Sequence, residues 1–261
     1  MIQLDFIKNF FPAFLQCDVA HTKHILKEYI QFMVLDYLSS TQYIRKLTFI
    51  GGTHLRLIKG IDRFSEDLDF DCKNFSKEEF MEMTNEILQF LERNGLKIEA
   101  KEKEDSQLKG FRRNIYFPQL LFELGLTGQR EERFLLKIEC QDQGVAYEPI
   151  ITHIRSCGFF FPIPVPPDSI LCAMKLSALL SRAKGRDFYD AMFLLAQTPP
   201  DYHFLNQRSN VQNLDELKQA VDKLLKTIDI NTKSRDFEHL LFNKHHSKKI
   251  LMFGEFLESF N

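Results

Sequence analysis

The chain has 261 residues, of which 44% are hydrophobic and only 11 are glycine and 9 proline. A chain of this length buries about 70–75% of its unfolded surface, so a disordered or fibrous protein is excluded. Lysine and arginine number 34 against 36 aspartates and glutamates, a net charge of −2. No global field therefore draws this protein to nucleic acid or to a membrane, and any basic surface must be local.

Cysteine usage and the N-terminus indicate where the protein works. The five cysteines form no Cys-x-x-Cys pair, and their odd number argues against a disulfide framework. The N-terminus lacks a basic stretch followed by an apolar run, and no segment approaches the roughly 20 apolar residues of a bilayer span. We expect a reduced, cytoplasmic protein without a membrane segment.

The N-terminal part alternates predicted helices and strands. Apolar residues at three- and four-residue steps predict a helix over Val19–Leu38. Leu47–Ile50 is a short apolar run that predicts a buried strand, and it ends at Gly51-Gly52, which predicts a tight turn. A short helix is expected over Thr53–Ile58.

The segment from Phe64 to Cys72 alternates strictly and predicts a strand. One of its faces carries Ser65, Asp67, Asp69 and Asp71, and the other face is largely apolar. Beyond it, Ser76 and Glu79 form a capping-box pattern for a helix that ends near Gly95. Three further strands are predicted around residues 96–100, 113–121 and 134–140.

The C-terminal part reads as helical. Prolines within residues 159–167 exclude a helix there and predict an extended crossover between two domains. Asp168 is expected to cap a helix that ends near Ser181, and further helices are expected over residues 187–196, 214–228 and 248–260. The predicted class is α+β, with a mixed-sheet domain over residues 1–165 and a helical domain over residues 166–261.

Asp67 and Asp69 are the strongest candidates for a metal site. Residues two apart on a strand point the same way, so both carboxylates can converge on one or two divalent cations. Like charges on one face repel one another unless a cation lies between them. Glu139, which shares a predicted strand face with Lys137, is the candidate third acid. The alternative is that these carboxylates are solvated and that Lys137 and Glu139 form an edge-strand pair.

Lys175 lies on a helical stripe among largely apolar residues. A buried ammonium needs an anionic partner, which is either a phosphate or a structural salt bridge to Asp187 or Asp190. Basic residues follow closely and predict the local positive patch that a triphosphate or an RNA requires; they are Arg182, Lys184 and Arg186.

Three blocks of sequence carry a family resemblance. They are Ile-Gly-Gly-Thr at residues 50–53, Arg-Phe-Ser-Glu-Asp-Leu-Asp-Phe at 63–70, and the stretch 175–190, which ends Arg-Asp-Phe-Tyr-Asp. Together they resemble the AbiEii-type nucleotidyltransferases, a group of the DNA polymerase β-like superfamily that includes toxins of abortive-infection and type IV toxin–antitoxin systems. The last block is the most specific. Its signature positions here are Lys175, Arg182, Lys184, Arg186, Asp187 and Asp190.

The resemblance implies a polymerase β-like catalytic domain and a metal-dependent transfer of a nucleoside monophosphate from a nucleoside triphosphate (NTP). It implies that Asp67 and Asp69 hold Mg²⁺ or Mn²⁺ and that Lys175 contacts phosphate. It further implies that Asp187 is a later catalytic acid and that the helical domain completes the cleft. The expected NTP-binding set is Gly51, Gly52, Thr53, Ser65, Lys175, Arg182 and Arg186. An RNA acceptor, in particular tRNA, and a winged-helix antitoxin are the implied partners.

The sequence departs from the family pattern at two points, and it also allows other interpretations of the function. Fourteen residues separate Gly52 from Asp67, more than the usual superfamily spacing, and the third acid is a glutamate where many relatives use aspartate. The rivals are a small-molecule nucleotidyltransferase of the antibiotic-modifying kind and a catalytically silent module that binds RNA or protein. The basic run Lys244–Lys249 fits a solvated loop or helix start better than an RNA contact.

Overall fold

The computed structural model describes residues 2–102 and 110–260. Contacts divide the chain into two compact units, each made of several pieces of sequence. The N-terminal unit comprises residues 1–59, 64–144 and 150–165. The C-terminal unit comprises residues 60–63, 145–149 and 166–261.

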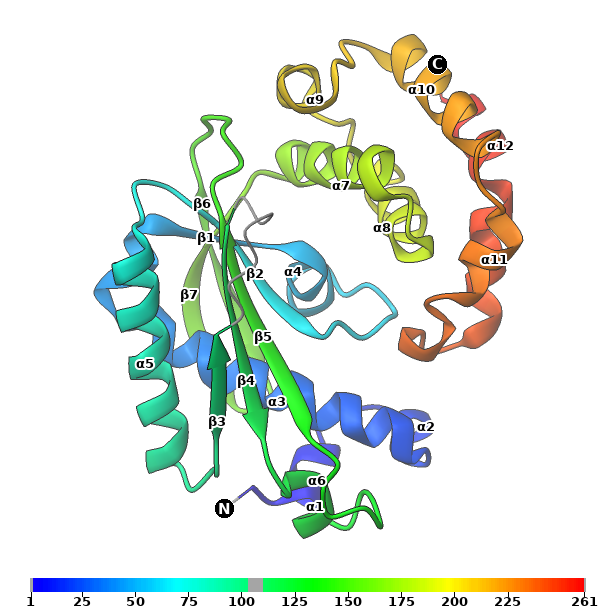
Figure 1. Cartoon of the computed structure of the whole chain (residues 1–261). Helices are drawn as coiled ribbons and strands as arrows, with labels where there is room; N and C mark the ends of the chain where they lie inside the picture. The colour runs from blue at the N-terminus through cyan, green and yellow to red at the C-terminus, as the bar shows by residue number, and fades with distance from the viewer. Residues whose placement is uncertain (1, 103–109, 261) are drawn as a thin grey trace. The chain divides into compact units, whose positions relative to one another are not determined.

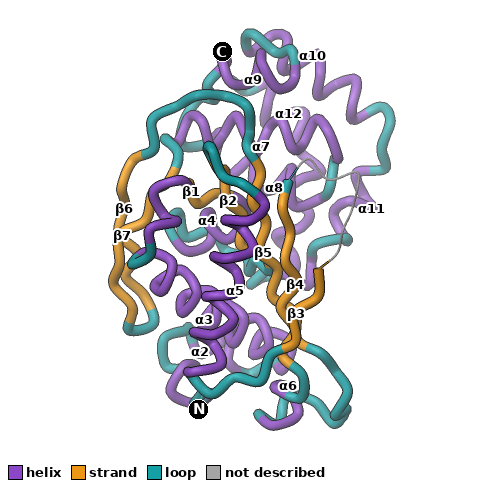
Figure 2. The backbone as a smooth tube through the Cα atoms, turned by 60° about the vertical axis from the view of Figure 1, so that its left-hand side comes forward, coloured by secondary structure: helices purple, strands orange, loops and turns teal. Residues whose placement is uncertain are grey.

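A five-stranded mixed sheet forms the centre of the N-terminal unit, with the strand order β1-β2-β5-β4-β3 (Figures 1 and 2). The strands are β1 (Leu47–Ile50), β2 (Asp67–Cys72), β3 (Glu99–Glu102), β4 (Phe111–Phe117) and β5 (Phe134–Gln141). β2 and β5 run parallel, and the other neighbouring pairs are antiparallel. The predicted α+β class with a mixed sheet is confirmed.

Alternation along the strands gives the sheet one apolar and one polar face. Leu68 and Phe70 of β2 and Ile138 and Cys140 of β5 are buried, whereas the residues between them are partly exposed. The helices α3 (Val19–Ser39) and α5 (Lys77–Arg93) belong to this unit, and α5 contacts β4. The predicted capping box at the start of α5 is confirmed.

Strand β2 begins three residues later than the alternation predicts. The carbonyl of Ser65 accepts a hydrogen bond from the side chain of Gln31 at 3.2 Å. It therefore pairs with a side chain of helix α3 and not with the backbone of a neighbouring strand. Ser65 therefore lies just before β2 and not within it.

The proline-rich segment is extended as predicted, but it is a strand and not a crossover. β7 (Phe159–Val165) pairs with β6 (Ile150–Ser156) in a two-stranded antiparallel sheet. Phe161, Ile163 and Val165 are buried, and the two prolines of the strand alternate with them. Proline is tolerated here because each strand of a two-stranded sheet is an edge strand.

The other elements of both units are helices. Those of the N-terminal unit are short: α1 (Leu4–Lys8), α2 (Ala13–Gln16), η1 (Gln42–Lys46), α4 (Gly51–Leu57) and α6 (Leu120–Glu123). Those of the C-terminal unit are α7 (Asp168–Arg182), α8 (Gly185–Leu195), α9 (Tyr202–Ser209), α10 (Leu214–Leu225), α11 (Ile230–Arg235), η2 (Glu238–Leu240), η3 (Lys244–Met252) and α12 (Phe253–Glu258). The sequence predicted a helical C-terminal part but gave no bounds for α9 and α11.

Two expectations about the helical part are wrong in detail. Asp168 is not the cap of α7, because Pro167 occupies the N-cap position and Asp168 is an acidic residue of the first turn. The expected last helix is a 3₁₀ helix, η3, followed by the short helix α12. Among the residues described, no helix has both the length and the apolar character needed to cross a bilayer.

Candidate active site

The two glycines, predicted to form a turn before a helix, are instead the first residues of helix α4, and Gly51 lies directly against the Asp-x-Asp strand. Gly51 has a φ of +85°, and a Cβ placed on it would lie 2.1 Å from the Oδ2 atom of Asp69. Thr53 is fully buried, and its hydroxyl donates a hydrogen bond to the backbone carbonyl of Asp67. Only glycine allows this close approach, since any side chain at position 51 would displace the Asp69 carboxylate.

The predicted acidic residues lie on the polar face of the sheet. The parallel register places Asp67 opposite Lys137 and Asp69 opposite Glu139. The Nζ atom of Lys137 lies 3.2 Å from Oδ2 of Asp67 and 3.7 Å from Oε1 of Glu139. The Nε of Arg112, on β4, donates to the same Glu139 oxygen at 2.7 Å.

Asp71, the last acidic residue of the row, has a structural role. It is buried, and its Oδ1 accepts a hydrogen bond from the backbone N–H of Gln143 at 2.9 Å. The Nζ of Lys73 lies 3.5 Å from the same oxygen. Asp71 therefore anchors the loop after β5.

The carboxylates on this face suit a divalent cation only in part. Within residues 2–102 and 110–260, no group of three histidine, cysteine or acidic side chains is arranged to hold a metal ion. Asp67 and Asp69 offer the hard oxygen ligands that Mg²⁺ prefers, and an ammonium group already bridges Asp67 and Glu139. The two aspartates therefore fit a cation whose remaining ligands come from a substrate.

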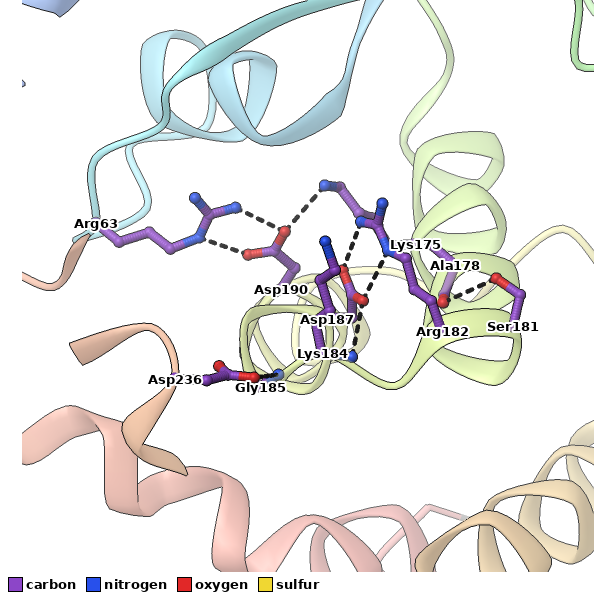
Figure 3. Close-up of polar contacts among 10 residues, drawn as sticks. All are labelled: Arg63, Lys175, Ala178, Ser181, Arg182, Lys184, Gly185, Asp187, Asp190 and Asp236. Atoms are coloured by element: carbon purple, nitrogen blue, oxygen red, sulfur yellow. Dashed lines mark hydrogen bonds and ion pairs between the residues drawn. The ribbon is translucent and has the colours of Figure 1, made fainter. Parts of the chain in front are cut away.

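Within the C-terminal unit, Lys175 is paired with Asp190. Its Nζ lies 2.9 Å from Oδ2 of Asp190, and Arg63 donates to both oxygens of the same carboxylate at 2.7 Å (Figure 3). Arg63 and Asp190 are each 1% exposed and Lys175 is 7% exposed. Burial alone would raise the pKa of Asp190, but the charges of Arg63 and Lys175 outweigh it and lower the pKa to about 2.

Asp187 has a different partner. Both of its oxygens accept hydrogen bonds from Arg182, at 2.8 and 2.9 Å, and the backbone N–H of Lys184 donates to it at 3.2 Å. The carboxylate thus joins the end of α7 to the first turn of α8 (Figure 3). Of the two salt bridges that the sequence left open for Lys175, the structure contains the one to Asp190.

Gly185 sits where α8 begins and where the backbone of α11 approaches closely. A Cβ on Gly185 would lie 1.9 Å from the carbonyl oxygen of Lys233, and its N–H donates to Asp236 at 3.1 Å. Arg186, the next residue, is half-buried in the first turn of α8.

The contacts of residues 60–63 were not predicted from the sequence. The sequence feature that pointed to this segment was the long spacing between Gly52 and Asp67. By its contacts this short segment belongs to the C-terminal unit. Asp62 accepts a hydrogen bond from the hydroxyl of Tyr189 at 2.5 Å and lies 2.6 Å from Nδ1 of His246. Arg63 forms an isolated antiparallel bridge with Leu241. The extra residues of the connection therefore build part of the helical unit.

Several side chains of the basic run within η3 are exposed, as a solvated surface would be. Lys244, His245, Lys248 and Lys249 are exposed, whereas Ser247 is buried.

Comparison with solved structures shows the same fold in two bacterial proteins. MenT4, a nucleotidyltransferase toxin of Mycobacterium tuberculosis, has a TM-score of 0.61 and 18% identity, over 100% of this chain and 91% of that one. JHP933 from Helicobacter pylori has a TM-score of 0.56 and 20% identity, over 90% of each chain. No curated protein sequence matches this chain.

The family comparison is more specific than these likenesses. Residues 34–256 match the family described as "Nucleotidyl transferase AbiEii toxin, Type IV TA system". The match spans β1 and its glycine turn, the Asp-x-Asp strand and the helices α7 and α8. The chain therefore belongs to the AbiEii family of nucleotidyltransferase toxins and is a nucleotidyltransferase.

Proposed function

We propose that the protein transfers a nucleoside monophosphate from an NTP to a hydroxyl of RNA, in particular of tRNA, with Mg²⁺ or Mn²⁺ as cofactor. The observation that supports this most strongly is the contact between Gly51 and the carboxylate of Asp69. It joins a turn suited to phosphate and a strand suited to a cation in one local structure.

In this proposal the N-terminal unit holds the triphosphate and the cation. Asp67 and Asp69 bind the cation, with Glu139 as the third acid of the face. The bound cation neutralises charge on the triphosphate and on the leaving pyrophosphate. Gly51, Gly52 and Ser65 face the triphosphate in this proposal, and Thr53, which the sequence placed in the same set, holds α4 against β2 through its hydrogen bond to Asp67.

The C-terminal unit supplies positive charge. A phosphate contact of Lys175 is proposed on the family resemblance alone, because in the structure its buried ammonium group is bonded to Asp190. Arg182 and Arg186 are the other basic residues of this unit to which the family resemblance gives a role in nucleotide binding.

The chemical step is an in-line displacement at the α-phosphorus. The acceptor oxygen forms a bond to phosphorus, the bond to the β-phosphate oxygen breaks, and pyrophosphate leaves. A carboxylate takes the proton of the acceptor hydroxyl. Glu139 suits this role better than Asp187, because Glu139 is 30% exposed whereas both oxygens of Asp187 are bonded to Arg182.

The proposal also covers partners and location. The family description points to a toxin–antitoxin system, so we propose an antitoxin with a winged-helix part as partner. A cytoplasmic location is proposed because NTPs and tRNA are found there.

The test incubates purified protein with each α-labelled NTP, Mg²⁺ and total cellular RNA. The matched control is the Asp67→Ala/Asp69→Ala variant, checked for an unchanged thermal transition. Label should enter RNA with the wild type alone, and the labelled band identifies the nucleotide and the class of acceptor. Equal labelling by the folded variant would refute the role of the two aspartates.

Two other results point to the rival interpretations. Metal-dependent NTP binding without RNA labelling would indicate a small-molecule or protein acceptor. A folded protein that binds neither nucleotide nor metal would be a silent binding module.

A further inference from the structure

The side chain of Lys137 lies among the acidic groups of the polar sheet face. Its Nζ is 3.2 Å from Asp67 Oδ2 and 3.7 Å from Glu139 Oε1. Lys137 and Asp67 are each 26% exposed, so the ammonium group reaches solvent as well as the carboxylates. Glu139 has a second cationic partner in Arg112, at 2.7 Å.

Arg112 and Lys137 therefore have different roles on this face of the sheet. Arg112 pairs with Glu139, whereas Lys137 lies between Asp67 and Glu139 and contacts both carboxylates. Carboxylates on neighbouring strands of one sheet face repel one another, and an ammonium group between them lowers that repulsion. Lysine suits such a task because its flexible stem lets the charge leave again.

The Lys137 ammonium group is 3.2 Å from the Asp67 carboxylate, so a divalent cation bound to the same carboxylate would be repelled by it. Two like charges about 4 Å apart repel one another by about 1 kcal/mol even in water, and more where solvent is partly excluded. The ammonium must therefore move away from Asp67 when a metal ion binds, and Glu139 is within its reach.

We infer that Lys137 is an internal counter-ion of the candidate metal site, which a divalent cation must displace from Asp67. The inference rests on the proposed function, in which Asp67 and Asp69 hold the metal. Its consequence is that the free protein binds metal weakly. The metal ion then enters together with the triphosphate, whose negative charge offsets the cost of moving Lys137 and gives the ammonium a new partner.

The experiment measures Mn²⁺ binding to the full chain without nucleotide, from the electron paramagnetic resonance signal of free Mn²⁺. Lys137→Met removes the competing charge and should lower the dissociation constant about fivefold or more. Lys137→Arg keeps a positive charge and should stay within about twofold of the wild type.

A matched control accounts for the change in net charge. Lys23 pairs with Glu132 at 2.6 Å, and the two side chains are 29% and 33% exposed, which is close to the exposure of the Lys137–Asp67 pair. Lys23→Met removes one positive charge from an ion pair that does not include the carboxylates of the sheet face, and it should leave Mn²⁺ affinity within about twofold of the wild type.

Three results would overturn the inference. The first is that Lys137→Met binds Mn²⁺ no more tightly than Lys23→Met, and the second is that Lys137→Arg gains as much affinity as Lys137→Met. The third result concerns the Asp67→Asn/Asp69→Asn variant in the Lys137→Met background, which must lose the gained affinity. If it does not, Mn²⁺ binds elsewhere and the metal site of the proposed function fails as well, whereas the first two results refute the counter-ion alone.

Discussion

The backbone of Gly51 brings helix α4 against the Asp69 carboxylate. Its φ of +85° lies in the left-handed region, and the Asp69 carboxylate occupies the space where a Cβ would project. The two constraints have different consequences, because the first affects stability and the second affects the position of a proposed metal ligand.

Gly51→Ala is therefore expected to abolish nucleotide transfer while the protein stays folded. The added Cβ would lie 2.1 Å from Asp69 Oδ2, so the carboxylate must move. The backbone strain should lower the free energy of unfolding by about 1–2 kcal/mol. Transfer assays and urea unfolding on the same preparation measure both effects.

Gly125→Ala is the matched control for strain. Gly125 has a φ of +68°, and a Cβ on it would have no atom within 4 Å. This variant should show a similar loss of stability and full activity. If both variants lost activity equally, the contact with Asp69 would not be the reason for glycine at position 51.

At the scale of elements, a buried charge cluster joins α7, α8 and the segment 60–63. Asp190 on α8 binds Lys175 on α7 and Arg63 on the segment, and all three side chains are buried. Removing one partner of such a cluster leaves uncompensated charge in the interior, which costs more than the intact cluster contributes.

Asp190→Asn should lower the free energy of unfolding at pH 7 by about 3–5 kcal/mol, as measured by urea denaturation. Asp222→Asn is the same chemical change at an exposed position of α10 and should alter it by less than about 0.5 kcal/mol. Equal stability of the two variants would show that the cluster does not stabilise the helical unit.

The lowered pKa of the Asp190 carboxylate predicts that the free energy of unfolding decreases at acid pH. The pKa of Asp190 falls from an ordinary value of 3.8 to about 2 in the folded protein. A lowered pKa contributes stability above pH 4, here about 2 kcal/mol, which is lost as the pH falls from 4 through 2. Asp190→Asn should lack this part of the acid dependence, and unfolding curves across this pH range measure it.

Much of this organisation can be predicted from hydrophobic period and turn chemistry. The periodic pattern over Val19–Leu38 predicted α3 to within one residue, and Ser76 with Glu79 predicted the capping box of α5. Both are local signals. The alternation through β2 likewise placed Asp67 and Asp69 on one face.

Other features depend on partners distant in sequence. The proline-rich segment became strand β7 because β6 pairs with it, and proline alone does not reveal an edge strand. Lys175 had two aspartates one helical turn apart as candidates, and the choice of Asp190 depends on Arg63, which comes 112 residues before Lys175 in sequence. The long spacing between Gly52 and Asp67 was the only local sign of residues 60–63.

At the scale of the whole molecule, the C-terminal unit is not a continuous piece of chain. Residues 60–63 and 145–149 belong to it together with residues 166–261. These two short segments contribute Ile61 and Val145, which are buried, and Arg63, which pairs with Asp190.

A fragment of residues 166–261 is therefore expected not to fold cooperatively, because it lacks these buried side chains and the partner of Asp190. Circular dichroism during urea titration should show a gradual loss of helix for the fragment and a cooperative transition for the full chain. A sharp transition of the fragment would show that residues 60–63 and 145–149 are dispensable.

Labels at both ends of the triphosphate distinguish nucleotidyl transfer that depends on Asp69 from other reactions of an NTP. Parallel reactions contain the NTP labelled at the α- or at the γ-phosphate, with total RNA as acceptor and Asp69→Ala as control. We expect that α-label enters RNA, that γ-label is released only in pyrophosphate, and that both signals vanish in the folded variant. Transfer of γ-label to RNA, or undiminished α-labelling by Asp69→Ala, would contradict this expectation.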